Sequence, residues 1–127
     1  MVLEAVKTGS SGELARAIEE GGNVDSMDIM GKTALMYAAE NGDLEKVSLL
    51  VENGADIDYK NKKEYTALRY AVENNRIEVC RYLIEHGADF DYKNEFGWTP
   101  LMTAAKYGHF DIFKMLLEYG ADIEART

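Results

Sequence analysis

The sequence predicts an all-α repeat solenoid, a stack of helix-turn-helix units, and three observations support this fold class. The tripeptide Gly-Ala-Asp occurs three times at 33-residue intervals, starting at Gly54, Gly87 and Gly120. A threonine followed by Ala-Leu or Pro-Leu recurs with the same step. Each copy contains two short apolar stripes, and two short helices cannot bury an apolar face without a neighbouring copy.

The first helix of each copy is expected to begin after its threonine and to end where left-handed backbone is tolerated. The three threonines are placed to act as N-caps, and Pro100 follows one of them at the first helical position. Glycine or asparagine closes the helix, because both types tolerate a positive φ. The closing residues are Gly42, Asn75 and Gly108.

The second helix of each copy has its apolar residues at spacings of three, six and seven, which form one helical stripe. In one copy these residues are Leu44, Val47, Leu50 and Val51, and apolar residues stand 33 and 66 positions later. In the first copy, Ser10 and Glu13 have the spacing of a capping box.

The repeat divides the 127 residues into one domain of four units. A truncated first unit begins at Met1, and three full units of 33 residues follow it. Thr127 would begin a fifth unit. The boundaries are 1–27, 28–60, 61–93 and 94–126.

The repeated pattern resembles the ankyrin repeat over the whole chain. Asp28, Gly31, Thr33-Ala34-Leu35, Ala38-Ala39, Gly42 and the closing Gly54-Ala55-Asp56 carry the resemblance in one unit. The resemblance implies antiparallel helix pairs with β-hairpin fingers at right angles between neighbours. It also implies that the protein binds partner proteins in a concave groove formed by the fingers and first helices.

One departure from the family pattern has a structural consequence. The glycine of the hairpin turn, Gly31 and Gly97 in two units, is replaced by Glu64 in the third. If the turn keeps its left-handed backbone, Glu64 is strained by roughly 1 kcal/mol. We therefore expect Glu64→Gly to stabilise the protein.

The two ends of the stack differ. Terminal repeats need polar outer faces, and the first unit has Ser11 and Arg16 where the other units are apolar. The last unit keeps Phe110, Phe113 and Met115. Three explanations of this apolar end are open: a longer native chain, end-to-end self-association, or tolerated exposure of apolar surface. Whether the chain continues past Thr127 stays open. We expect a monomer, with association through the uncapped last repeat as the alternative.

Composition excludes several classes of protein. The chain has 23 Asp and Glu against 14 Lys and Arg, and its net charge of −9 argues against a nucleic-acid partner. One cysteine cannot form an internal disulfide. We expect neither a signal peptide nor a transmembrane segment, since residues 1–7 lack the order of a signal peptide and no stretch is long and apolar enough to span a bilayer, and we expect no membrane partner. We expect a cytoplasmic protein, or one delivered into a host cytosol.

No catalytic, metal or cofactor site is expected. Cys80 occupies a core position of the repeat and is interpreted as a small buried hydrophobe. His86 and His109 lie near helix boundaries, where capping or solvation is their expected role. The paired carboxylates near the end of each unit recur with the hairpin, and Asx-turn hydrogen bonds explain them without a metal ion.

Matching the units to the ankyrin groove gives the expected partner-binding residues. They are Ile29, Met30, Lys32, Tyr37, Lys62, Lys63, Tyr65, Tyr70, Phe96, Trp98, Lys106 and Tyr107. Trp98 and Phe96 are the favoured anchors, because aromatic residues dominate interface hot spots. Tyr59 and Tyr92 repeat identically, and we interpret them as packing between adjacent fingers.

Charge further restricts the expected partner. Lysines gather on the central fingers, whereas acidic residues line the second helices, so an acidic protein segment is the expected ligand of the groove. The chain could instead be the targeting or substrate-recognition domain of a larger enzyme or effector, or an engineered ankyrin-type binder. Ala34, Ala67 and Glu64 depart from the family consensus and argue against a consensus design.

Overall fold

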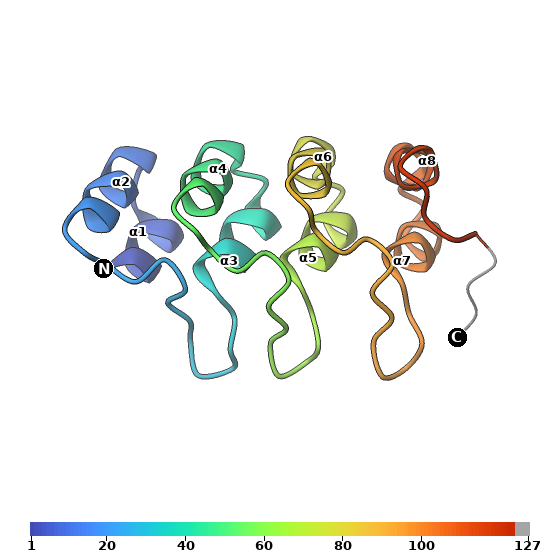
Figure 1. The fold of residues 1–127 in the computed structure, drawn as a ribbon, viewed down its shortest axis with the longest axis horizontal. Coiled ribbons are helices and arrows are strands. Elements are labelled where there is room, and N and C mark those ends of the chain that lie inside the picture. Colours follow the sequence, from blue (N-terminus) through green and yellow to red (C-terminus); the bar gives the residue numbers. More distant parts are fainter. Residues whose placement is uncertain (124–127) are drawn as a thin grey trace.

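The structure, a computed structural model, describes residues 1–123, and these residues form eight helices arranged as four pairs (Figure 1). Each pair lies within one of the four repeat units defined above. The helices are α1 (Val2–Thr8), α2 (Ser11–Glu19), α3 (Ala34–Asn41), α4 (Leu44–Glu52), α5 (Ala67–Glu73), α6 (Ile77–Glu85), α7 (Pro100–Lys106) and α8 (Phe110–Glu118).

The four pairs stack side by side into two layers of helices. Helix α3 packs between α1 and α5, and α5 packs on α7, so the first helices form one layer. Helices α2, α4, α6 and α8 form the second layer in the same order. The predicted all-α repeat solenoid is therefore confirmed.

The predicted caps are present at the helix ends. The hydroxyls of Thr33, Thr66 and Thr99 each accept a hydrogen bond from the amide three residues on. Ser10 and Glu13 form the expected capping box at the start of α2. Asn75 has φ of 58°, in the same left-handed region as the glycines that follow the other two first helices.

Three fingers project from the edge of the first-helix layer, but they contain almost no β-structure (Figure 1). Finger 1 spans residues 28–32, finger 2 spans 61–65 and finger 3 spans 94–98. Within residues 1–123 the only strand-like pairing is one isolated bridge between Met27 and Thr33. The expected β-hairpins are thus reduced to tight turns.

An acidic or amide side chain holds each turn. The Oδ1 atom of Asn61 accepts hydrogen bonds from the amides of Lys63 and Tyr65, both at 2.9 Å. Asp28 and Asn94 accept two amides in the same way. These side chains satisfy the amides that a longer β-ladder would otherwise pair.

The core lies between successive units. Leu14, Leu50 and Leu83 are fully buried, and Val47 and Cys80 occupy equivalent buried positions on α4 and α6. Burial raises the pKa of the Cys80 thiol to about 12, so it stays protonated at neutral pH. The interpretation of Cys80 as a core residue is confirmed.

A donor from each following unit also caps the first helix of the unit before it. The Nε of Arg76 donates to the Glu40 carbonyl at 2.9 Å, and His109 Nε2 lies 2.9 Å from the Glu73 carbonyl. In both cases the acceptor is in the last turn of a first helix, where carbonyls lack intrahelical partners.

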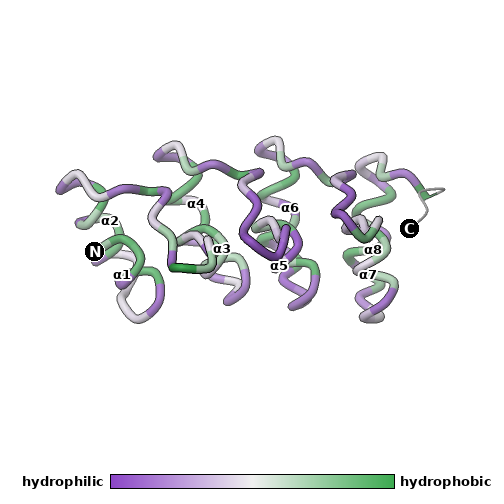
Figure 2. The backbone as a smooth tube through the Cα atoms, turned by 90° about the horizontal axis from the view of Figure 1, so that it is seen from below, coloured by the Kyte–Doolittle hydropathy of each residue, from purple (hydrophilic) through white to green (hydrophobic). Residues whose placement is uncertain are grey.

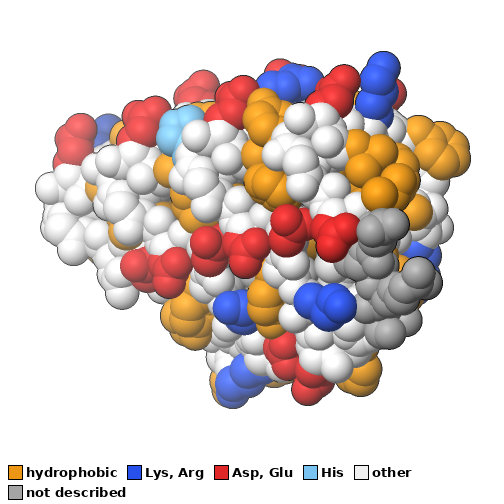
Figure 3. Space-filling model, turned by 45° about the vertical axis from the view of Figure 1, so that its right-hand side comes forward, with side chains coloured by type: hydrophobic (Ala, Val, Ile, Leu, Met, Phe, Trp, Pro, Cys, Tyr) orange, Lys and Arg blue, Asp and Glu red, His pale blue; other side chains and the backbone are white. Residues whose placement is uncertain are grey.

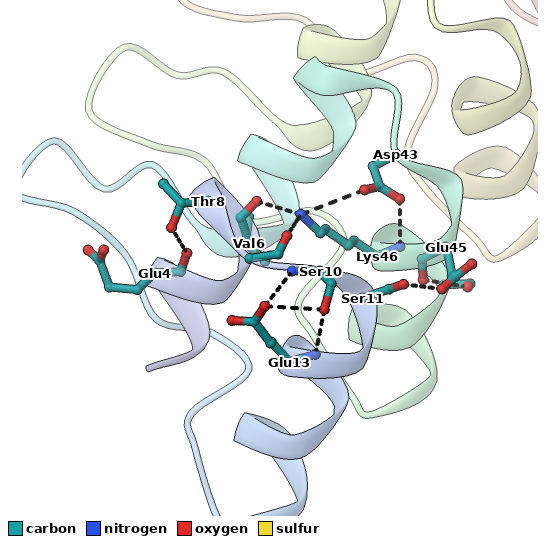
Figure 4. Close-up of polar contacts among 11 residues, drawn as sticks. Glu4, Val6, Thr8, Ser10, Ser11, Glu13, Asp43, Glu45 and Lys46 are labelled. Carbon is teal, nitrogen blue, oxygen red and sulfur yellow. Dashed lines mark hydrogen bonds and ion pairs between the residues drawn. The ribbon is translucent and has the colours of Figure 1, made fainter.

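Between the first and second units, the junction formed by α1 to α4, Lys46 supplies the donor from a different position of the repeat (Figure 4). Its ammonium donates to the carbonyls of Val6 at 3.1 Å and Gly9 at 2.7 Å, and Asp43 lies 3.7 Å away. The residue is only 9% exposed. The repeat pattern does not predict this contact, because the equivalent residues in the later units are apolar.

The outer face of the first unit is polar, although one residue expected there lies elsewhere. Arg16 is exposed on that face together with Glu4 and Glu13, as expected of a cap. The Ser11 hydroxyl instead donates to the Glu45 carboxylate of the second unit (Figure 4). Ser11 therefore belongs to the first junction, because its position on α2 faces the following unit.

We expect Lys46→Met to lower the free energy of unfolding by about 1–3 kcal/mol, because the carbonyls at the end of α1 would lose their buried donor. Urea denaturation followed by circular dichroism measures the change. The matched control is Lys114→Met, at an exposed position of α8, which should change stability by about 0.5 kcal/mol or less. Equal effects of the two substitutions would contradict this role for Lys46.

Candidate protein-binding surface

The twelve residues expected to bind a partner lie on the fingers and the first helices, and we call them together the finger-helix surface. The fingers stand in a row along one edge of the stack (Figure 1). The Lys62 amide donates to the Met30 carbonyl at 3.1 Å, which joins finger 2 to finger 1. The Glu95 amide donates to the Glu64 carboxylate at 3.2 Å, which joins finger 3 to finger 2.

Seven of the twelve residues are exposed to solvent. Ile29 is 86% exposed and Phe96 is 70% exposed, the highest values among the large apolar residues of the fingers. The other five exposed residues are Met30, Lys62, Lys63, Lys106 and Tyr107. Viewed from the finger side, Figure 2 shows a hydrophobic stretch on the first finger and a hydrophilic second finger.

Four of the remaining five residues, Lys32, Tyr37, Tyr65 and Tyr70, contribute mainly to the protein's own packing, and Tyr70 is the clearest correction. Tyr70 is 8% exposed, and its hydroxyl accepts a hydrogen bond from the Asn61 side chain at 2.9 Å. It therefore supports finger 2 from behind and offers a partner almost no surface. The repeat periodicity placed Tyr70 on the correct helix face, but it could not predict how deeply the side chain is buried.

Lys32 is also used within the fold. Its ammonium lies 2.6 Å from the Glu40 carboxylate and 4.3 and 4.8 Å from the ring centroids of Tyr37 and Tyr70. The ion pair and the two cation–π contacts hold the base of finger 1 against α3 and α5. Lys32 therefore stabilises finger 1, and its charge is already paired with the Glu40 carboxylate.

Tyr37 braces the same finger through its hydroxyl. It donates to the Asp28 carboxylate at 2.7 Å. This hydrogen bond, together with burial, raises the pKa of Tyr37 to about 12. It also lowers the pKa of Asp28, and the finger amides bonded to that carboxylate act in the same direction.

Tyr65 belongs to a cluster that was not predicted from the sequence. Its ring lies 5.1 Å from the Tyr70 ring, and the Arg69 guanidinium stands 4.3 Å from the Tyr65 centroid. The Arg69 Nε donates to Glu73 at 2.9 Å. The spacing of Tyr65, Arg69 and Glu73 at intervals of four was the signal for this cluster.

Trp98 is half-buried at the base of finger 3, where an exposed cation covers it. The ammonium of Lys106 lies 5.3 Å from the Trp98 ring and 5.6 Å from the Tyr107 ring. Trp98 also has its amide bonded to Asn94. Phe96, at the tip of the same finger, presents the larger free apolar surface.

The interpretation of Tyr92 as a spacer between fingers agrees with its contacts. Its hydroxyl donates to the Glu64 carboxylate at 2.7 Å, and burial together with this bond raises the pKa of Tyr92 to about 12. The Lys60 ammonium lies 4.5 Å from its ring. Tyr59 packs against the core, with its hydroxyl near the Met27 sulfur.

Glu64 has the expected left-handed backbone, with φ of 61°. The expected backbone conformation is confirmed, but the side chain has a role that the sequence did not reveal. Its carboxylate accepts hydrogen bonds from the Tyr92 hydroxyl and the Glu95 amide. Because glycine would lose both bonds, the expected stabilisation by Glu64→Gly is revised below.

The paired carboxylates at the ends of the units form a row of backbone acceptors. Asp25, Asp58 and Asp91 each accept the amide of an aspartate 31 residues further along the chain, at 2.9–3.1 Å. Asp56 and Asp89 accept the amide two residues on, as in an Asx turn. Most of these carboxylates therefore tie one unit to the next or close a local turn.

The exposed charged residues are unevenly distributed over the surface. Lys62 and Lys63 are exposed at the tip of finger 2, while exposed carboxylates such as Glu45, Glu78 and Asp111 lie on the second helices. Figure 3 shows acidic side chains, with some lysine or arginine, along the second-helix edge, and side chains of both signs among the fingers. Residues 28–32, 61–65 and 94–98 together carry three lysines and three carboxylates, so only the tip of finger 2 is locally basic.

Comparison with known proteins identifies the repeat. The sequence matches a family described as ankyrin repeats (3 copies), over residues 2–94 and 55–127. No curated protein matches the chain significantly. Among residues 1–123, none of the helices is long and apolar enough to cross a bilayer.

We expect the protein to lose stability as pH rises from about 10 to about 12. The folded state holds the Tyr37 and Tyr92 protons more tightly than the unfolded chain, whose tyrosines have a pKa near 10.0. Below pH 10 the stabilisation is complete, and it disappears as the pH passes the folded pKa. Urea titrations across this range should give a shallower decrease for Tyr37→Phe/Tyr92→Phe than for the wild type, and equal slopes would contradict the assignment.

We expect Glu64→Gly to leave stability unchanged or to lower it by about 1 kcal/mol. Relief of the left-handed strain, roughly 1 kcal/mol, is offset by two lost hydrogen bonds of about 0.5–1.5 kcal/mol each. A double-mutant cycle with Tyr92→Phe isolates the bond between the side chains. A coupling energy near zero, or a clear gain in melting temperature for Glu64→Gly, would show that strain dominates.

Proposed function

The chain belongs to the ankyrin-repeat family, whose repeats are generally protein–protein interaction modules, and we propose that it binds a partner protein through the finger-helix surface. In this proposal the protein acts by presenting a rigid concave surface, without catalysis. The twelve residues have different parts. The exposed ones contact the partner, and Lys32, Tyr37, Tyr65 and Tyr70 hold the fingers in place.

The exposure of apolar side chains on braced fingers carries the proposal. Ile29 and Phe96 are 86% and 70% exposed, although each lies in a turn whose amides are bonded to an Asp or Asn side chain. Stability of the fold does not require large apolar groups at such positions. A rigid turn also loses little conformational entropy when a partner binds.

The charges between these apolar tips support an acidic segment as the ligand. Finger 2 places the exposed Lys62 and Lys63 between Met30 on finger 1 and Phe96 on finger 3. Lys106 adds an exposed cation at the base of finger 3. A partner segment with apolar side chains flanking carboxylates would complement this order of residues.

The partner can be obtained by affinity capture from the native cells with mass spectrometry, and its affinity measured by titration calorimetry. We expect Phe96→Ala and Trp98→Ala each to weaken binding by about 2 kcal/mol or more. Phe110→Ala, which truncates an exposed phenylalanine on α8, is the matched control and should bind normally. A partner that binds Phe96→Ala/Trp98→Ala as well as the wild type would overturn the proposal.

The acidic character of the ligand has its own test. We expect Lys62→Glu/Lys63→Glu to slow association and to remove most of the salt dependence of binding. Asp111→Lys/Glu118→Lys, on α8, changes the net charge by the same amount in the opposite sense and should alter association far less. Salt-independent binding by the wild type would leave the surface in place but exclude an acidic segment.

A further inference from the structure

The contact between finger 2 and finger 3 is built differently from the contact between finger 1 and finger 2. In the first contact, the Lys62 amide donates directly to the Met30 carbonyl at 3.1 Å. Glu95 is the residue equivalent to Lys62 in the next unit. Its amide donates instead to the Glu64 carboxylate, at 3.2 Å. A side chain therefore replaces a backbone carbonyl as the acceptor between fingers 2 and 3.

Glu64 also introduces a side chain where the first two fingers have none. Its equivalent is Gly31, where an added Cβ atom would lie 3.4 Å from the Asn61 Cα atom and 3.6 Å from the Lys62 nitrogen. Fingers 1 and 2 thus approach each other through their backbones. Finger 3 packs against the Glu64 side chain, so its distance from finger 2 depends on that side chain.

The same carboxylate holds the segment that leads into finger 3. The Tyr92 hydroxyl donates to it at 2.7 Å, and Tyr92 stands just before finger 3 begins at Asn94. The hydroxyl of the equivalent Tyr59 lies 3.4 Å from the Met27 sulfur instead. An ionised carboxylate only accepts hydrogen bonds, and it can take both of these donors at once. One side chain therefore fixes both the approach to finger 3 and its first turn.

A small cavity beside Glu64 connects this carboxylate to a residue expected to bind the partner. Its lining includes Glu64, Arg69, Tyr92 and Trp98, and its volume of about 10 Å³ has room for about one water molecule. Trp98 is half-buried there, and it is the only tryptophan of the chain. A displacement of finger 3 from finger 2 would widen this cavity and expose the Trp98 ring.

We propose that Glu64 is the positioning residue of finger 3 and that it thereby selects the partner. Its carboxylate sets how far Phe96 and Trp98 stand from the lysines at the tip of finger 2. A bound segment must match that distance, because any other spacing leaves a charge unpaired or an apolar side chain uncovered. The selection of a partner rests on the proposed function, whereas the placement of finger 3 does not.

Quenching of Trp98 fluorescence by acrylamide, a neutral quencher, tests the placement of finger 3 without any partner. Glu64→Ala deletes the carboxylate but keeps a Cβ atom on the left-handed backbone, so we expect the quenching constant to rise. Glu64→Gln retains an acceptor oxygen and should stay close to the wild type. Glu95→Ala is the matched control, because it truncates an exposed carboxylate on finger 3 and leaves the amide in place.

Thermal denaturation followed by circular dichroism verifies that each variant is folded. Tyr92→Phe removes one of the two hydrogen bonds and should give an intermediate quenching constant, which keeps the test valid if Glu64→Ala is unfolded. Wild-type quenching in both Glu64→Ala and Tyr92→Phe, or equal quenching in Glu64→Ala and Glu64→Gln, would overturn the placement of finger 3 by this carboxylate.

Selection from a library of displayed random peptides tests the choice of partner. Peptides of about twelve residues are long enough to cross the three fingers in extended form. They are selected in parallel on the wild type, Glu64→Gln and Glu64→Ala. We expect the first two proteins to enrich sequences with one common separation between acidic and apolar positions, and Glu64→Ala to enrich a different or broader set of separations.

The outcomes separate this proposal from the proposed function. The same separation enriched by all three proteins would overturn the role of Glu64 in selecting a partner. Enriched peptides that bind Phe96→Ala/Trp98→Ala normally, or no enrichment by the wild type, would contradict the proposed function and with it the selection. The fluorescence measurement decides the placement of finger 3 in every case.

Discussion

The stack depends on burial of apolar surface between units that cannot fold separately. Each helix has only seven to nine residues, well below the length at which an isolated helix is stable in water. Leu14, Val47 and Cys80 are fully buried only because another unit lies against them. Every feature of the fingers therefore rests on the junctions beneath them, and a weakened junction would displace the finger that it supports.

The junctions also explain why part of the fold could be predicted and part could not. The helix caps and turn residues follow from local chemistry at fixed positions, so Thr33, Asn75 and Pro100 identified their helix ends correctly. The donors between units do not recur at one position. Arg76 and His109 are equivalent, but Asp43 stands at the equivalent site in the second unit and Lys46 supplies the donor. A search for residues at identical spacing overlooks such a contact, because a hydrogen-bond donor recurs at each junction but its residue type and position change.

The same limit applies to the finger-helix surface. Matching the units to the ankyrin groove placed its residues on the correct elements, but it gave no information on depth. Tyr70 and Phe96 were both predicted to contact a partner, yet one is 8% exposed and the other 70%. The difference arises from partners that are distant in the chain or specific to one unit. Asn61 and Lys32 hold Tyr70 inward. Phe96 lies at a turn whose bonds are made by Asn94, by the turn's own backbone and by the Glu64 carboxylate, and its side chain stays exposed.

The bracing contacts further determine which of the positive charges can act on a ligand. Lys32 and Arg69 are matched by Glu40 and Glu73 and lie against tyrosine rings. Their charges hold the fingers and contribute little field beyond the surface. Lys62 and Lys63 lie at the tip of finger 2, where the Asn61 turn and the bond to Met30 fix the backbone. A long-range attraction from these two lysines can therefore act on an approaching acidic segment, although the molecule as a whole is strongly negative. The apolar tips on either side then supply the short-range contacts that determine how long the complex lasts.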